Sequence, residues 1–187
     1  MDTDLTDLTD LEALRAELQR LRDHEEIRQL LYRYARGVDR ADLDLIRSVY
    51  AADGTDHHGA FDGPGRDFAQ VVCDKATETW DTVGNHHITN VLIEVDGDQA
   101  KAEVYFLALH PHHRDGTTLM AVMSGRYIDQ LERADGKWGI KRRRVITDLS
   151  RNHLGGPEWQ NVSPDNGYLA GRRGNTDPSY DLFPAGD

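Results

Sequence analysis

The sequence has a single cysteine, Cys73, few basic residues, and no apolar run near the roughly 20 residues that a membrane-spanning helix needs. One cysteine excludes an intrachain disulfide and a cysteine-rich metal site, and it suits a reducing cytoplasm. The 22 basic residues against 33 acidic ones give a net charge of −11, which repels phosphate backbones, so we expect no nucleic-acid partner. The polar, acidic start at residues 1–10 lacks the basic and apolar segments of a secretory signal. We therefore expect a cytoplasmic protein that does not contact membranes.

Motifs that hold cofactors are also missing. We find no Walker loop, no dinucleotide-binding glycine fingerprint and no H-E-x-x-H helix. The nine histidines include groups at 57–58 and 110–113, but these lie in turn-rich segments without a defined carboxylate spacing. The sequence therefore predicts no metal and no cofactor, and it favours cofactor-free chemistry on, or simple binding of, a neutral and apolar small molecule.

Helical periodicity dominates the first 80 residues. Leucines recur at 3-4-3 spacing in segment 1–24, which lacks Gly and Pro and predicts an amphipathic helix that packs on the body or on another subunit. These leucines are Leu11, Leu14, Leu18 and Leu21. The period continues from Ile27 and predicts a second helix that finishes near Gly37 and Asp39. Segments 42–50 and 66–80 predict two more helices, and the turn-rich segment 52–65 leaves room for a short strand.

From His86 onward the period changes to two. We expect strands over 86–95, 100–110, 118–132 and 138–149, joined by hairpins at 96–98, 111–116 and 134–136. Helices followed by long antiparallel strands predict an α+β fold in which helices cover one face of a curved sheet. With 187 residues the chain fits one domain, which we place at 25–149 after the N-terminal helix 1–24, and an irregular tail follows at 150–187.

Three segments resemble the SnoaL-like group of the nuclear transport factor 2-like superfamily. They read L-Y-x-Y-A-x-G-V-D at 31–39, G-N-H-H-I-T-N at 84–90 and G-R-Y-x-D-x-L-E-R-x-D-G-x-W at 125–138. The resemblance implies a cone-shaped, curved antiparallel sheet, also called a cystatin-like roll. The pattern is most similar to the dehydratase and dehydrohalogenase branch, with scytalone dehydratase, hexachlorocyclohexane dehydrochlorinase and bile-acid 7α-dehydratase. In those enzymes a histidine is the base and an aspartate orients it.

The resemblance implies catalytic roles for three residues. The Asp of G-V-D is Asp39, the histidine base is His86, and a tyrosine five positions before the aspartate is Tyr34. An imidazole titrates near neutral pH and can remove a proton from carbon, while a carboxylate fixes its tautomer and stabilises the imidazolium. Two other interpretations stay open: Asp39 as a helix-end turn residue, and Tyr34 as a core residue with its hydroxyl bonded.

The resemblance also implies substrate-binding roles. Arg143, five positions after the closing tryptophan, matches the dehydrochlorinase pattern, and His110 is the nearest match to a polar residue late in the second long strand. Asn90, in the strand of His86, is a third candidate. A phenol or guanidinium in a dry pocket can stabilise the departing group or an enolate oxygen. Alternatively, Arg143 lies on an exposed strand and pairs with an acidic residue.

Strand parity disagrees with the choice of His86. Plain alternation places His87 on the side of Val91 and Ile93, and His86 on the other side with Ile88. We retain His86 because the family pattern places the base there and because a bulge can re-aim a side chain beside an active site.

Together these features predict a cofactor-independent lyase that removes water, a halide or formaldehyde from an apolar cyclic or aromatic substrate. The same cone could instead serve an isomerase or an epoxide hydrolase with an aspartate base, or a non-catalytic assembly module like the small subunits of ring-hydroxylating oxygenases. Cone-type sheets expose an apolar outer face, so we expect a homodimer or a homotrimer.

Overall fold

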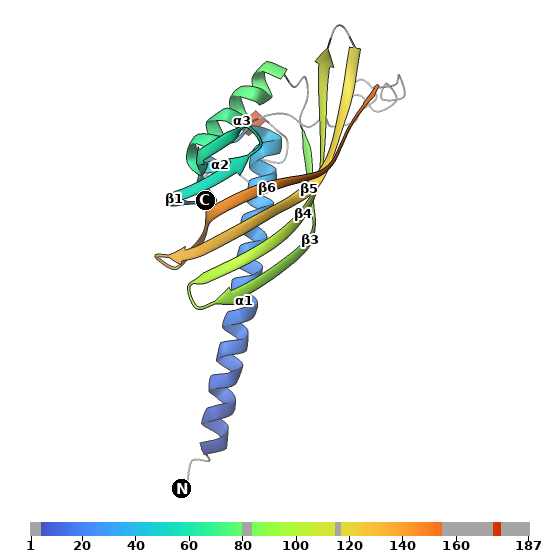
Figure 1. Ribbon diagram of the computed structural model, residues 1–187. Coiled ribbons are helices and arrows are strands. Elements are labelled where there is room, and N and C mark those ends of the chain that lie inside the picture. The colour runs from blue at the N-terminus through green and yellow to red at the C-terminus, as the bar shows by residue number, and fades with distance from the viewer. Residues whose placement is uncertain (1–4, 80–83, 115–116, 155–173, 177–187) are drawn as a thin grey trace.

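The computed structural model describes residues 5–79, 84–114, 117–154 and 174–176 (Figure 1). The helices come first and the long strands follow. In chain order the elements are α1 (Leu5–Arg40), α2 (Leu43–Ser48), β1 (Tyr50–His58), β2 (Phe61–Pro64), α3 (Gly65–Thr79), β3 (Asn85–Asp96), β4 (Gln99–Arg114), β5 (Thr117–Ala134), β6 (Lys137–Leu154) and the 3₁₀ turn η3 (Gly174–Thr176).

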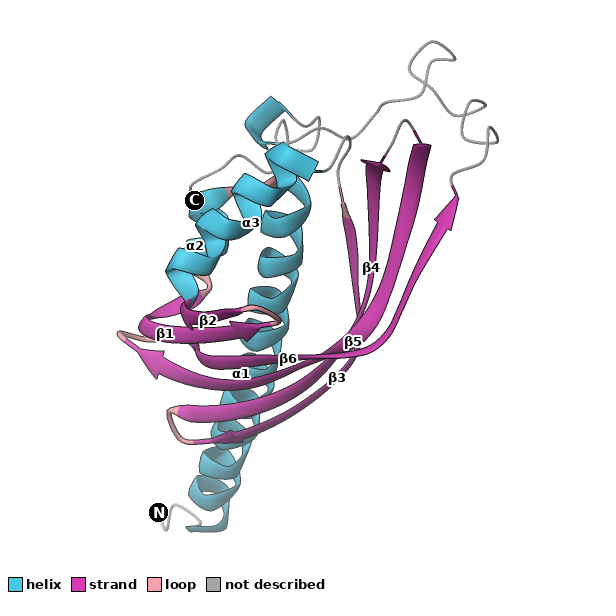
Figure 2. Cartoon of the chain, turned by 45° about the horizontal axis from the view of Figure 1, so that its top comes forward, coloured by secondary structure: helices cyan, strands magenta, loops and turns pink. Residues whose placement is uncertain are grey.

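The six strands form one curved, unclosed sheet in the order β2-β1-β6-β5-β4-β3. Neighbouring strands are antiparallel except β1 and β6, which pair in parallel. Helix α1 passes across one face of the sheet, and α2 and α3 lie beside the C-terminal half of α1 (Figure 2). The predicted α+β class, with helices on one face of a curved sheet, is therefore confirmed.

Three expected element boundaries are corrected. The two helices expected over 1–24 and 27–39 are one continuous helix, because nothing between Leu21 and Ile27 breaks it. The turn-rich segment 52–65 belongs to the hairpin of β1 and β2. The joint expected at 111–116 is shorter, since Pro111 lies in β4 opposite Met120. Pro111 is tolerated there because β3 begins at Asn85, opposite Leu109, so β4 has no β3 partner beyond that point.

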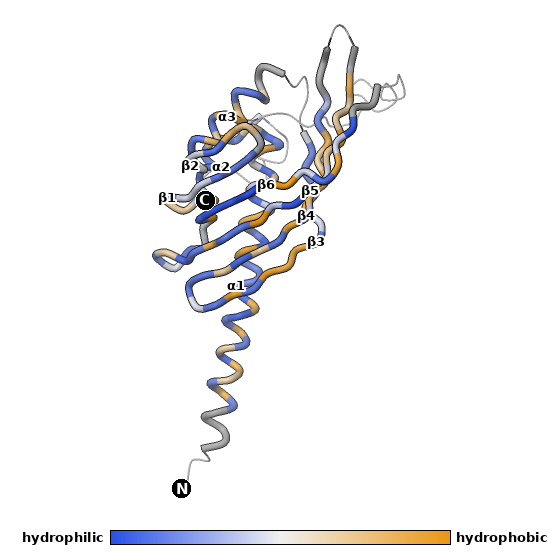
Figure 3. Tube along the Cα trace, viewed as in Figure 1, coloured by the Kyte–Doolittle hydropathy of each residue, from blue (hydrophilic) through white to orange (hydrophobic). Residues whose placement is uncertain are grey.

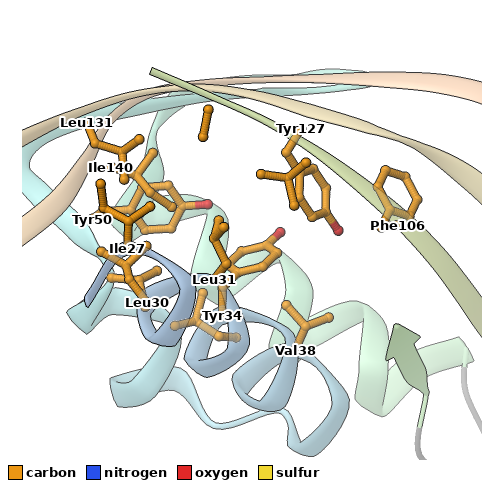
Figure 4. Packing of buried hydrophobic residues seen from close by; sticks show 14 of the residues in the cluster. Ile27, Leu30, Leu31, Tyr34, Val38, Tyr50, Phe106, Tyr127, Leu131 and Ile140 are labelled. Atoms are coloured by element: carbon orange, nitrogen blue, oxygen red, sulfur yellow. The ribbon is translucent and has the colours of Figure 1, made fainter. Parts of the chain in front are cut away.

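The core lies between α1 and the concave side of the sheet (Figure 4). The buried residues of α1 recur at helical spacing, and each strand contributes every second residue to the core. The α1 contribution is Ile27, Leu30, Leu31, Tyr34 and Val38, and the strands add Phe106, Tyr127, Leu131 and Ile140. Asp39 and His86 lie just past Val38, where this packing ends.

Asp23 fixes the point at which α1 leaves the sheet. Its carboxylate is buried and accepts hydrogen bonds from Trp138 Nε1 at 3.1 Å, Arg133 Nη1 at 2.5 Å and Gln19 Nε2 at 3.1 Å. Residues 10–22 of α1 are all exposed. The helix therefore consists of a packed C-terminal part and an N-terminal part that projects from the body (Figure 1).

None of the helices in the described part of the chain is both long and apolar enough to cross a membrane. Most of the predicted tail 150–187 lies outside the described residues, although β6 extends into it as far as Leu154.

Candidate functional site

The last turn of α1 and the first residues of β3 bring Asp39 and His86 together. His86 Nδ1 lies 2.7 Å from Asp39 Oδ1, and the backbone N–H of His86 donates to both carboxylate oxygens at 3.0 and 3.1 Å. Only 8% of the His86 side chain and 12% of the Asp39 side chain are exposed. A neutral imidazole that donates from Nδ1 to the carboxylate has its lone pair on Nε2. The pair therefore has the arrangement of a histidine base held by an aspartate.

A bulge in β3 resolves the parity conflict between His86 and His87. The β3–β4 register shifts between Ile88 and Val91, so His86 and Ile88 share the half-buried side with Val91. His87 is exposed. Asn90 lies within the bulge and is also exposed, so the structure does not bring it to His86.

His110 of β4 lies beside the pair. It is buried, and its ring meets the His86 ring edge-on, with centroids 4.9 Å apart at 68°. Gly84 makes this position possible, because a Cβ at that residue would lie 3.0 Å from His110 Nδ1. The inward orientation expected for His110 from alternation along β4 matches the structure.

A hollow of about 360 Å³ reaches the pair between α1 and β3. Five of its lining residues come from α1 and two from β3, and both members of the pair are among them. The lining consists of Tyr32, Ala35, Arg36, Asp39, Arg40, His86 and Ile88. A small molecule in this hollow would contact a mixed surface of apolar side chains and cations.

Arg143 occupies a second, fully buried cluster. Its guanidinium donates from Nε to Asp129 Oδ1 at 2.8 Å and from Nη2 to Asp129 Oδ2 at 2.6 Å. It also lies 4.1 Å from the ring centroid of Tyr34 and 4.2 Å from that of Tyr127. The exposed-strand interpretation of Arg143 is wrong, because alternation along β6 buries it and exposes Arg142 and Arg144. The expected pairing with an acidic residue is present.

Tyr34 belongs to this second cluster. It is 1% exposed and packs edge-on against Tyr50 and Tyr127. Burial raises the pKa of its phenol well above the usual value. The core interpretation of Tyr34 therefore describes its position.

The sequence did not predict a third polar group on β1. Tyr50 donates its hydroxyl to Asp56 Oδ2 at 2.5 Å, and Asp56 Oδ1 lies 3.8 Å from His58 Nδ1. Burial raises the pKa of Asp56 to about 6, and burial with the nearby cation of Arg143 lowers the pKa of His58 to about 3. Asp56 pairs opposite Arg143 in the parallel β1–β6 ladder, so its burial depends on a contact between distant segments. One indication of this group was present in the sequence, because Asp56 and His58 are two positions apart and would lie on the same face of a strand.

The raised pKa of Asp56 makes stability depend on pH. A carboxyl with a pKa of about 6 in the folded protein and 3.8 in the unfolded chain contributes stability that is present below pH 3.8 and lost as the pH rises through 6. The difference corresponds to about 3 kcal/mol. Relative to the Asp56→Asn variant, the wild-type protein should therefore lose about 2–3 kcal/mol of unfolding free energy between pH 4 and pH 7. Urea unfolding of both proteins at the two pH values measures this change, and a constant difference would contradict it.

Among the described side chains, the histidines form no recognisable metal site. Over the described ranges, no three His, Cys, Asp or Glu side chains are grouped so that they could hold a metal ion. His57 is exposed and lies 3.4 Å from Asp62, whereas the side chains of His112 and His113 lie outside the described ones.

Solved structures with similar folds are numerous. A candidate scytalone dehydratase from Novosphingobium aromaticivorans is 20% identical, with 73% of this chain and 91% of that chain covered and a TM-score of 0.63. A hexachlorocyclohexane dehydrochlorinase from Novosphingobium barchaimii is 20% identical, with 75% and 96% covered and a TM-score of 0.66. A cystatin-like protein from Nostoc punctiforme is 21% identical, with 67% and 91% covered and a TM-score of 0.56. At these identities the likeness shows the fold, and it confirms the predicted cone.

No curated protein sequence matches the chain. The sequence model of the SnoaL-like domain family, in contrast, matches residues 19–144 of the chain. This segment runs from just before the point where α1 meets the sheet to the middle of β6, and it contains Asp39, His86 and Arg143. Because the match covers well over half of the chain, the protein belongs to the SnoaL-like domain family.

Proposed function

We propose that the protein is a cofactor-independent lyase in which His86 removes a proton from carbon and Asp39 holds the imidazole. The observation that carries the proposal is the 2.7 Å contact between His86 Nδ1 and Asp39 Oδ1 in a site that is almost fully buried. This contact leaves Nε2 as the basic atom and places a negative charge beside the imidazolium that forms.

The proposed reaction is an elimination. His86 Nε2 accepts the proton, the electron pair of the C–H bond forms the new double bond, and the leaving group departs with its own bonding electrons. His110 is a candidate donor to the leaving group, because its ring contacts that of His86. A donor positioned where charge develops can stabilise the transition state by about 3–4 kcal/mol.

The substrate class follows from charge and from the surroundings of the pair. A net charge of −11 disfavours anionic substrates, and the core next to the pair is aromatic and aliphatic. Arg36 and Arg40 line the same hollow and could contact a polar group of a mostly apolar substrate. The structural neighbours named as dehydratase and dehydrochlorinase support elimination of water or a halide from an apolar cyclic compound. Loss of formaldehyde is a related cleavage in which the base would take the hydroxymethyl O–H proton, the O–H electron pair would form the formaldehyde carbonyl, and the C–C electrons would form the new double bond as the leaving group departs.

Asp56 favours a second candidate function. Its pKa of about 6 gives a carboxyl that can exchange protons near neutral pH, as an aspartate base in an isomerase or an epoxide hydrolase would. Its Oδ1 is buried and forms no hydrogen bond with other described groups. In this alternative Tyr50 and Arg143 would support Asp56, and His86 would not be required.

A non-catalytic assembly module has less support. Such a role predicts a site filled by bulky residues with Asp39 and His86 out of reach of each other. The interior around Tyr34 and Tyr127 is indeed filled, but the pair itself is within hydrogen-bonding distance.

A panel of aromatic diols, steroids, organic halides and epoxides, with product analysis, tests the two catalytic candidates. For each substrate that is converted, the wild-type protein is compared with His86→Ala and Asp56→Asn. We expect elimination products that depend on His86 and not on Asp56. Hydrolysis or isomerisation that survives His86→Ala and is lost in Asp56→Asn would replace the lyase proposal by the second candidate.

A further inference from the structure

The projecting part of α1 carries an apolar stripe that nothing in the described chain covers. Leucines occupy the stripe at 3-4-3 spacing, and their exposed fractions are 42%, 65%, 47% and 52% for Leu11, Leu14, Leu18 and Leu21. Figure 3 shows hydrophobic positions recurring along this part of the helix. Four leucines this exposed on one helix face are costly in water unless they are covered.

The stripe faces away from the protein's own sheet. Leu18 precedes the buried Ile27 by nine positions, which is about two and a half helical turns, so the two side chains point to opposite sides of α1. A helix that packed on the stripe would therefore lie on the side of α1 that the body leaves open. Two copies of the chain could pair through this stripe with their bodies on the outside.

From this arrangement we infer that α1 forms a parallel coiled coil with α1 of a second copy of this chain. The leucines fill the positions a, d, a and d of two heptads. The helix needs no nucleation there, because its C-terminal part is already formed on the sheet. The inference is independent of the catalytic proposal.

The flanking charges select the parallel orientation. The g positions are Asp10 and Glu17, and the e positions are Arg15 and Arg22. In a parallel pair each g residue faces the e residue five positions later on the other helix, so Asp10 meets Arg15 and Glu17 meets Arg22. In an antiparallel pair g faces g and e faces e, which sets like charges together. In the single chain Glu17 pairs with Arg20 on its own helix, an exposed contact that a partner could replace.

The same heptad register explains where the coil should end. The next a position is Glu25 and the next d position is Arg28, and both are charged. Two Glu25 side chains facing each other would repel. The contact therefore spans about two heptads, from Asp10 to His24, and stops where Asp23 anchors α1 to the sheet.

Molecular mass in solution provides the first test. Sedimentation equilibrium of the full chain should show an assembly, and the double variant Leu14→Lys/Leu18→Lys should raise its dissociation constant at least about a hundredfold. Circular dichroism and thermal unfolding check that the body stays folded, since both side chains lie outside the core. A monomeric wild-type protein, including one whose stripe is covered by its own C-terminal residues, would overturn the inference. So would an assembly with an unchanged dissociation constant in the variant.

Charge exchange and cross-linking test the orientation. Arg15→Glu/Arg22→Glu should weaken the assembly, and adding Asp10→Lys/Glu17→Lys should restore it, because parallel g–e pairs then attract again. In a Cys73→Ser background, Leu14→Cys should form a disulfide between copies on mild oxidation, since d faces d in a parallel pair. Ala16→Cys, at the outward f position, is the matched control and should not. Loss of assembly in the fourfold exchange, or equal cross-linking at both positions, would overturn the parallel coil.

Discussion

Asp39→Asn is expected to lower kcat by about 10²–10⁴-fold and to leave the protein folded. The amide keeps the size of the carboxylate but removes its charge. It can also donate to His86 Nδ1, which would place the imidazole proton on Nε2 and leave no base at the substrate. The loss should appear mainly in kcat, because the proposed role of Asp39 is to hold and stabilise His86.

Asp42→Asn is the matched control for this variant. Asp42 Oδ1 accepts the backbone N–H of Leu45 at 3.0 Å and caps α2, a role that asparagine fills equally well. Both variants remove one negative charge from the same helix junction, and steady-state kinetics with a thermal unfolding check compares them. Full activity in Asp39→Asn would contradict the positioning role of Asp39.

Arg143→Met is expected to lower the free energy of unfolding by about 3–5 kcal/mol, because it leaves the Asp129 carboxylate buried without its cation. Both side chains are 0% exposed, so water cannot compensate for the lost partner. The double variant Arg143→Met/Asp129→Leu removes both charges and should recover most of the loss. Equilibrium unfolding in urea measures all three proteins.

The neighbouring Arg144→Met serves as a control, since Arg144 is exposed on the other side of β6 and its replacement should change stability by less than about 0.5 kcal/mol. If Arg143→Met were as stable as Arg144→Met, the buried pair would not contribute to stability as described.

Local patterns predicted the strands well and the longer-range pairings poorly. The hairpins at Gly97 and Gly136 were predicted from the Asp-Gly pairs at 96–97 and 135–136, and in the structure each glycine has the positive φ that such a turn requires, 58° and 75°. The β1–β2 hairpin was hidden, because the core side of β1 is set by its parallel pairing with β6 and not by its own apolar content. The continuity of α1 was also missed, because the exposed leucines up to Leu21 and the buried residues from Ile27 lie on opposite sides of the helix, so the apolar pattern is interrupted although the helix is not.

The candidate site shows the same division. The position of His86 depends on a bulge between Ile88 and Val91, which plain alternation cannot reveal and which only the family pattern suggested. The burial of Arg143 follows from β6 alternation, but three consecutive arginines suggested a solvent-facing strand. Asp56 and His58 acquire their shifted pKa values from burial in the assembled core, which their alternation along β1 alone does not reveal.

Turnover by His86→Ala, compared with His87→Ala on a substrate that the wild-type protein converts, tests the catalytic proposal most directly. The two histidines are adjacent in β3, but His86 is bonded to Asp39 and His87 is exposed. We predict that His86→Ala lowers kcat by about 10²–10⁴-fold and that His87→Ala stays within about twofold of the wild type. Retained turnover in His86→Ala, or an equal loss in both variants, would contradict the assignment of His86 as the base.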